Sequence, residues 1–133
     1  MTEPRFGEVS FYQALADALN DDRHWLDMAT DITYSMTHVY RSPIGRTFFL
    51  QFDGGKLTEV AELGSAADRP ADFVIAGHPD TWQAVITKAT SPLAALTTGK
   101  LKVEGKLTTL IKQMAKFTYM IDKMTTLEPS FPS

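Results

Sequence analysis

Two kinds of hydrophobic spacing alternate along the chain and predict its helices and strands. From about Ser10 to Met28, apolar residues recur at helical spacing, with a break at residues 20–22. This segment is therefore expected to form the opening helix. From Ile32 to Tyr40, apolar and polar residues alternate, which predicts a strand with one buried and one mostly wet face.

A hairpin and two further strands follow in the pattern. Residues 46–53 and 56–63 flank Asp53-Gly54-Gly55, a turn signal that predicts two adjacent antiparallel strands. Residues 71–76 predict a fourth short strand, and residues 101–105 a fifth. Pro79 and Pro92 suit the first turns of two short helices, because proline at that position loses no hydrogen bond.

The last patterned segment, residues 107–124, predicts one long amphipathic helix. Its apolar stripe consists of Leu107, Leu110, Ile111, Met114, Phe117, Ile121 and Met124. Lys112, Lys116 and Lys123 fall on the opposite side, and residues 100–123 carry six lysines against two acids. We expect this helix to be a movable cover whose basic face approaches an anionic membrane or an acidic partner.

The order of elements predicts the class of fold. The pattern is that of an α+β protein: one helix, three strands, a further strand, two short helices, a strand and a final helix. We expect a five-stranded, mostly antiparallel sheet covered by helices on one face. With 133 residues and no linker, residues 1–133 are expected to form a single domain.

Composition and charge narrow the functional classes. The chain is 44% hydrophobic and 11% aromatic, which is enough apolar surface for a folded core. A net charge of −3 argues against nucleic-acid binding. The absence of cysteine excludes disulfides, thiolate metal ligands and a cysteine nucleophile. Residues 1–9 lack the apolar run of a secretory signal, so a cytoplasmic location is expected.

Few residues suggest catalysis or metal binding. His24, Asp27 and Asp31 have helical spacing, but solvated capping residues explain them better than a metal site. Asp72 with a pocket tyrosine could in principle move a proton on a bound ligand, although a strand-end role for Asp72 is favoured. We therefore expect no catalytic residue, no metal and no cofactor.

Several short sequence motifs in the second half of the chain resemble those of the sterol carrier protein 2 family. They are Ala71-Asp72-Phe73-Val74-Ile75, Asp80-Thr81-Trp82, Ser91-Pro92-Leu93-Ala94-Ala95-Leu96 and Gly99-Lys100-Leu101-Lys102-Val103-Glu104-Gly105. Their order and spacing, with the hairpin upstream, extend the likeness over most of the chain. Lys106 departs from the family, which commonly has an acid there, and the ending Phe131-Pro132-Ser133 is not the peroxisomal Ser-Lys-Leu type.

This resemblance implies a fold and a function. Such proteins hold sterols, fatty acyl chains or other lipids in an apolar cavity between the sheet and its helices. The residues expected to border that cavity are Met36, Phe48, Phe52, Ile75, Trp82, Ile86, Leu96, Leu101, Val103, Leu110, Met114, Phe117 and Ile121.

The expected function is that of a non-catalytic carrier for a hydrophobic small molecule. Two alternatives remain open. The protein could be an accessory subunit that presents an isoprenoid, acyl or steroid intermediate to a partner enzyme, or an enzyme that acts on the bound ligand.

Overall fold

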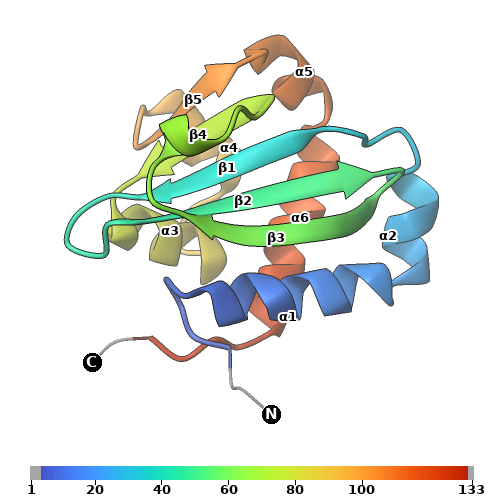
Figure 1. Ribbon diagram of the computed structural model, residues 1–133, viewed down its shortest axis with the longest axis horizontal. Coiled ribbons are helices and arrows are strands. Elements are labelled where there is room, and N and C mark those ends of the chain that lie inside the picture. The colour runs from blue at the N-terminus through green and yellow to red at the C-terminus, as the bar shows by residue number, and fades with distance from the viewer. Residues whose placement is uncertain (1–3, 132–133) are drawn as a thin grey trace.

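The computed structural model describes residues 4–131 and contains one five-stranded sheet with its helices (Figure 1). The strands are β1 (Ser35–Tyr40), β2 (Arg46–Asp53), β3 (Lys56–Leu63), β4 (Phe73–Gly77) and β5 (Leu101–Gly105). The α-helices are α1 (Val9–Asn20), α2 (Arg23–Met28), α3 (Pro79–Ile86), α4 (Pro92–Thr97), α5 (Leu107–Lys112) and α6 (Met114–Thr126). A short 3-10 helix, η1 (Ala66–Asp68), lies between β3 and β4.

The strand order explains why the sheet is mixed. The order is β3-β2-β1-β4-β5, and β1 pairs in parallel with β4 while the other neighbours are antiparallel. The chain leaves β3 at one edge and crosses the sheet before it enters β4 beside β1. In Figure 1, α3 and α6 lie behind the sheet, and α1 runs below β3. The expected α+β fold is confirmed, with a parallel pair at its centre.

The β2–β3 turn forms where the sequence predicts it. Gly54 and Gly55 have φ values of 59° and 89°, which suit a tight hairpin turn and strain any residue with a Cβ atom. A Cβ atom on Gly55 would also lie 2.8 Å from the carbonyl oxygen of Ala29. The turn therefore packs directly against the segment after α2, and the Trp25 indole donates a hydrogen bond to the Gly55 carbonyl at 2.7 Å.

The opening segment forms two helices, since the expected break falls between α1 and α2. Asp22 caps the second helix: its carboxylate accepts a hydrogen bond from the Trp25 backbone N–H at 3.1 Å. Strand β1 begins at Ser35, three residues later than the alternation at Ile32 suggests.

The second face of β1 is mostly buried, contrary to the expectation of a mostly wet face. Thr37 and Phe49, which are paired across β1 and β2 on that face, are 0% and 2% exposed. On β2, the crossover segment between β3 and β4 covers Phe49: the Arg69 guanidinium lies 4.0 Å from the centre of the Phe49 ring and pairs with Glu59. Alternation along β1 could not reveal a covering segment that comes from elsewhere in the chain.

The expected single helix over residues 107–124 is wrong, because it is two helices. The chain turns at Gln113, whose backbone N–H is shared between the carbonyls of Thr109 and Leu110. After this turn, α6 buries Phe117, Met120, Ile121 and Met124, whereas α5 buries only Leu110. Leu107 and Ile111 of the predicted stripe are 48% and 53% exposed.

Two of the three lysines on the expected basic face of this segment pair with carboxylates of the same protein. Lys123 Nζ lies 2.7 Å from the Asp22 carboxylate, and Lys116 Nζ lies 2.6 Å from that of Asp31. The Tyr119 hydroxyl donates a second hydrogen bond to Asp22 at 2.6 Å. These contacts form a polar clamp between α6 and the segment around α2, and they lower the pKa of both carboxyls.

Replacing Asp22 by asparagine is expected to weaken the clamp and lower the free energy of unfolding by about 1.5–3 kcal/mol, the range for a hydrogen bond to a charged group. The Asp22 side chain is only 13% exposed, so water replaces the lost interaction poorly. Urea unfolding measures the change, and amide exchange locates it in α6.

The matched control is Asp122→Asn, since Asp122 pairs with Lys88 at 3.3 Å while both side chains are about half exposed. This variant is expected to lose no more than about 0.5 kcal/mol. Equal losses in the two variants would contradict the clamp.

Candidate functional site

A pocket of about 310 Å³ lies between α4, β5 and α5. Its lining residues are Leu96, Gly99, Leu101, Lys102, Val103 and Leu107. Four of these are aliphatic, and Lys102 contributes a charged group beside an otherwise apolar wall. The volume falls at the lower end of the range for small-molecule sites, about 300–1,000 Å³.

Exposed aliphatic side chains surround this pocket. Leu93, Leu107 and Ile111 are 47%, 48% and 53% exposed, and they are the large hydrophobic residues most open to water in the described chain. Leu107 lines the pocket itself. Leu93 precedes Leu96 by three residues on α4, and Ile111 follows Leu107 by four on α5, so helical spacing places both beside pocket residues.

Behind the pocket lies the closed layer between the sheet and the helices. Ten of the thirteen residues expected to border a cavity are buried there, each no more than 3% exposed. They are Met36, Phe48, Phe52, Ile75, Trp82, Ile86, Leu101, Leu110, Phe117 and Ile121. Leu96, Val103 and Met114 are half-buried against the same core.

Of the expected site residues, the pocket brings together Leu96, Leu101 and Val103. The others lie in the core around it, and a cavity extending to all thirteen remains a prediction. Leu107 and Lys102 were not among the expected site residues. Hydrophobic spacing assigned Leu107 to a buried helix stripe, and only the turn at Gln113 shows that it belongs to a pocket rim.

A hydrogen-bonded cluster of His38, Tyr12 and Tyr40 lies inside the core. The Tyr12 hydroxyl lies 2.8 Å from His38 Nδ1 and 2.9 Å from the Tyr40 hydroxyl, and all three residues are 0% exposed. His38 Nε2 faces the Met36 sulfur at 3.1 Å. The Trp82 indole stacks on both His38 and Tyr40, and its N–H donates to the Val39 carbonyl at 2.9 Å.

Burial determines the ionisation of this cluster. Removal from water lowers the pKa of His38 to about 3 and raises the pKa values of Tyr12 and Tyr40 well above 10. His38 is therefore neutral near pH 7. The arrangement that uses every donor has Tyr40 donating to Tyr12, Tyr12 donating to Nδ1, and the Nε2 proton facing the weakly accepting thioether.

Of the residues considered for catalysis or metal binding, Asp72 and Asp31 take structural roles, while His24 and Asp27 are exposed on α2. The Asp72 carboxylate accepts a hydrogen bond from the Ser35 backbone N–H at 2.8 Å, and Ser35 Oγ lies 3.1 Å from the Asp72 N–H. Asp72 thus joins the starts of β1 and β4. Asp31 contacts Lys116 and Gln113. Among residues 4–131, no group of three His, Asp or Glu side chains has the arrangement of a metal site.

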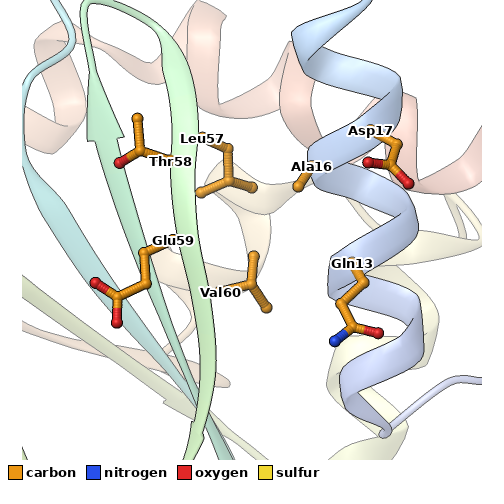
Figure 2. Close-up of a pocket in the computed structure, with 7 residues that line it drawn as sticks. All are labelled: Gln13, Ala16, Asp17, Leu57, Thr58, Glu59 and Val60. Carbon is orange, nitrogen blue, oxygen red and sulfur yellow. The ribbon is translucent and has the colours of Figure 1, made fainter.

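A second, more polar groove of about 230 Å³ runs between α1 and the edge strand β3. Figure 2 shows Ala16 of α1 facing Leu57 and Val60, with the carboxylates of Asp17 and Glu59 on either side. At one end, the Asn20 side chain hydrogen-bonds both the N–H and the carbonyl of Leu57, at 2.9 and 3.0 Å. Four of its seven lining residues are polar or charged, so this groove fits an apolar ligand less well than the first pocket.

Within the described part of the chain, no helix has the length and hydrophobicity needed to cross a bilayer.

Solved structures with the same fold include sterol carrier proteins. The crystal structure of sterol carrier protein 2 has a TM-score of 0.81 at 22% identity, covering 91% of this chain and 98% of that one. The solution structure of a conserved hypothetical protein from Thermus thermophilus has a TM-score of 0.83 at 23% identity, covering 99% and 94%. A third relative is UbiJ-SCP2, a ubiquinone synthesis protein (TM-score 0.59, 16% identity, 84% and 90% covered).

Comparison at the level of sequence agrees with the fold. A search of curated proteins gives no match. The model of the SCP-2 sterol transfer family matches residues 21–117, which include the whole sheet, α3, α4, α5 and the start of α6. The expected resemblance is thus confirmed over most of the chain, and the protein belongs to the SCP-2 sterol transfer family.

Proposed function

We propose that this protein is a non-catalytic carrier that binds one hydrophobic molecule, a sterol, a fatty acyl chain or another lipid. The observation that carries the proposal is the apolar pocket between α4, β5 and α5, whose wall continues into the core. Binding would derive its free energy mainly from apolar surface removed from water.

The layer behind the pocket favours ligands of several shapes. Leu101 lines the pocket and is 1% exposed, so its side chain joins the pocket wall to the core. Met36, Met120 and Met124 are buried in that core and Met114 is half-buried at its edge. Methionine side chains adapt their shape easily, so a lipid tail could extend inward from the pocket by displacing them.

The proposal predicts saturable binding of a fluorescent fatty acid in solution. Leu96→Ser is expected to weaken binding about 10-fold, because it removes apolar pocket surface worth on the order of 1–2 kcal/mol. Fluorescence titration measures the affinity, and native mass spectrometry identifies any lipid that purifies with the protein.

Leu93→Ser is the matched control. It is the same substitution on the same helix, at a residue that lies outside the pocket lining. The control is expected to retain the affinity of the unaltered protein. A wild type that binds neither the fatty acid nor a fluorescent sterol would refute the carrier proposal, and equal affinities in both variants would refute this location of the site.

A second candidate function is that of an accessory subunit that presents a lipid intermediate to an enzyme. The likeness in fold to UbiJ-SCP2, a ubiquinone synthesis protein, favours this alternative. It predicts a stoichiometric partner enzyme whose turnover of a lipid substrate rises when this protein is added. A protein that transfers ligand between vesicles alone, without such a partner, would fit the free carrier instead.

An enzymatic role has less support from the geometry. Asp72 and Ser35 hydrogen-bond to each other at the starts of β4 and β1. His38 is enclosed by Tyr12, Met36 and Trp82. Turnover of a bound lipid that disappears in Asp72→Asn while the fold persists would reverse this conclusion.

A further inference from the structure

We propose that the edge of the molecule formed by α4, β5 and α5 is a docking surface for anionic lipid bilayers. The docking surface consists of the exposed aliphatic residues Leu93, Leu107 and Ile111 and the lysines Lys100, Lys102, Lys106 and Lys112. In Figure 1, β5 and α5 form the upper edge, at the opposite side of the sheet from β3. Only the role of this surface in delivering a ligand rests on the proposed carrier function; binding to bilayers does not depend on it.

The apolar part of this surface is left about half in water by the fold. Leu93, Leu107 and Ile111 are each about half exposed, while the neighbouring Leu110 and Ala95 are 0% and 1% exposed. Aliphatic groups that remain in water gain free energy when they enter the boundary between lipid headgroups and acyl chains.

The charged part selects the kind of partner. Residues 89–115 contain four lysines and one acid, Glu104, although the chain as a whole has a net charge of −3. All four lysines are exposed, and within residues 4–131 none of them lies in a salt bridge. Unpaired lysines beside exposed aliphatic groups match a surface that is anionic outside and apolar inside.

The helix that the sequence suggested for this role is less suitable. Lys116 and Lys123 of α6 are held by Asp31 and Asp22, so an anionic lipid would have to displace those carboxylates. Lys112, at the end of α5, is the one lysine of that predicted face that belongs to the docking surface.

The pocket opens on the docking surface. Leu107 and Lys102 belong both to the docking surface and to the pocket lining. A bilayer seated on this edge would therefore cover the pocket mouth. An apolar ligand could then pass between the membrane and the pocket without crossing water.

The test is co-sedimentation of the full chain with vesicles of phosphatidylcholine, with and without about 30% phosphatidylglycerol, at low and high salt. Binding is expected only with the anionic lipid, and weaker at high salt. Lys100→Gln, Lys106→Gln and Lys112→Gln together should weaken it about 100-fold at low salt, since each lysine contributes about one kcal/mol at an anionic surface. Ile111→Ser should weaken it about 10-fold.

The matched control removes three positive charges elsewhere, by Arg23→Gln, Arg46→Gln and Lys56→Gln. Lys56 begins β3 at the far edge of the sheet, and Arg46 pairs with Glu62 across β2 and β3. The control is expected to change vesicle binding by less than about 3-fold, because these residues are not part of the docking surface and β2 and β3, which carry Arg46 and Lys56, lie on the other side of the sheet from β5.

Three results would overturn the proposal. They are no binding to either kind of vesicle, equal binding to both kinds, and an equal loss in the control and the docking variant. Fatty-acid titration without vesicles tests the carrier function separately from bilayer docking. A chain that binds fatty acid and no vesicle is a carrier with another means of delivery, whereas one that binds vesicles and no fatty acid refutes the carrier alone.

Discussion

Leu110→Glu is expected to lower the free energy of unfolding by about 3–5 kcal/mol, the usual cost of an uncompensated charge in a protein interior. Leu110 is 0% exposed and is the one residue that α5 buries in the core. A carboxylate there either remains ionised without a partner or takes up a proton, and both outcomes disfavour the folded state. Since a small domain has only about 5–15 kcal/mol in total, the variant should melt far below the wild type.

The matched control for Leu110→Glu is Leu107→Glu. It is the same substitution one turn earlier on α5, at a residue that is 48% exposed. The expected change in unfolding free energy is within about 0.5 kcal/mol, as for most surface substitutions. Thermal and urea unfolding of both variants measure the difference. Similar stabilities would mean that α5 does not pack as described.

Acidification from about pH 7.5 to about pH 4.5 is expected to remove about 2–3 kcal/mol of stability through His38 alone. The pKa of His38 is about 3 in the folded protein against 6.5 for an unperturbed histidine. Between these values the unfolded chain binds a proton that the folded protein does not bind. Stability therefore falls as the pH falls, by about 1.4 kcal/mol per pH unit below 6.5.

Protonation of carboxylates affects stability in a lower pH range than protonation of His38. The pKa values of Asp22, Asp31 and Glu59 are lowered from ordinary values of 3.8, 3.8 and 4.5, so the stability they contribute is lost only as the pH falls below those values. The slope between pH 6.5 and about 5 thus reports mainly on buried histidine.

Urea unfolding across this range, with His38→Phe beside the wild type, tests the assignment. The phenyl ring keeps an aromatic partner for Trp82 and removes the titrating group, so the slope in this window should fall in the variant. In the wild type, the ring protons of His38 should show no titration by NMR down to about pH 4.5. A midpoint above pH 5, or an unchanged slope in the variant, would show that His38 is hydrated.

Local patterns were sufficient for most secondary structure. The hairpin over residues 46–63 and its Gly54-Gly55 turn follow from alternation and from the need for positive φ, both of which are encoded by neighbouring residues. The starts of α3 and α4 follow from Pro79 and Pro92 in the same way.

The long final helix shows where a local pattern misleads. Residues 107–124 keep helical hydrophobic spacing across Gln113, and the spacing does not change where the chain turns. The spacing also assigns Leu107 and Ile111 to the buried stripe, whereas both remain at the surface and only Leu110 of α5 enters the core. Periodicity records which residues are apolar, whereas exposure depends on what the rest of the chain covers.

The class of fold and most of the elements can be predicted from the sequence, because backbone preferences and hydrophobic spacing act over a few residues, and the family can be recognised from its short motifs. Other features appear only once the chain is folded: the parallel pairing of β1 with β4, the Arg69 side chain over the Phe49 ring, and the pairing of Lys116 and Lys123 with distant carboxylates. The tertiary structure also decided which aliphatic residues face the pocket and the docking surface. Each of these depends on contacts between segments far apart in the chain, which spacing along the sequence does not encode.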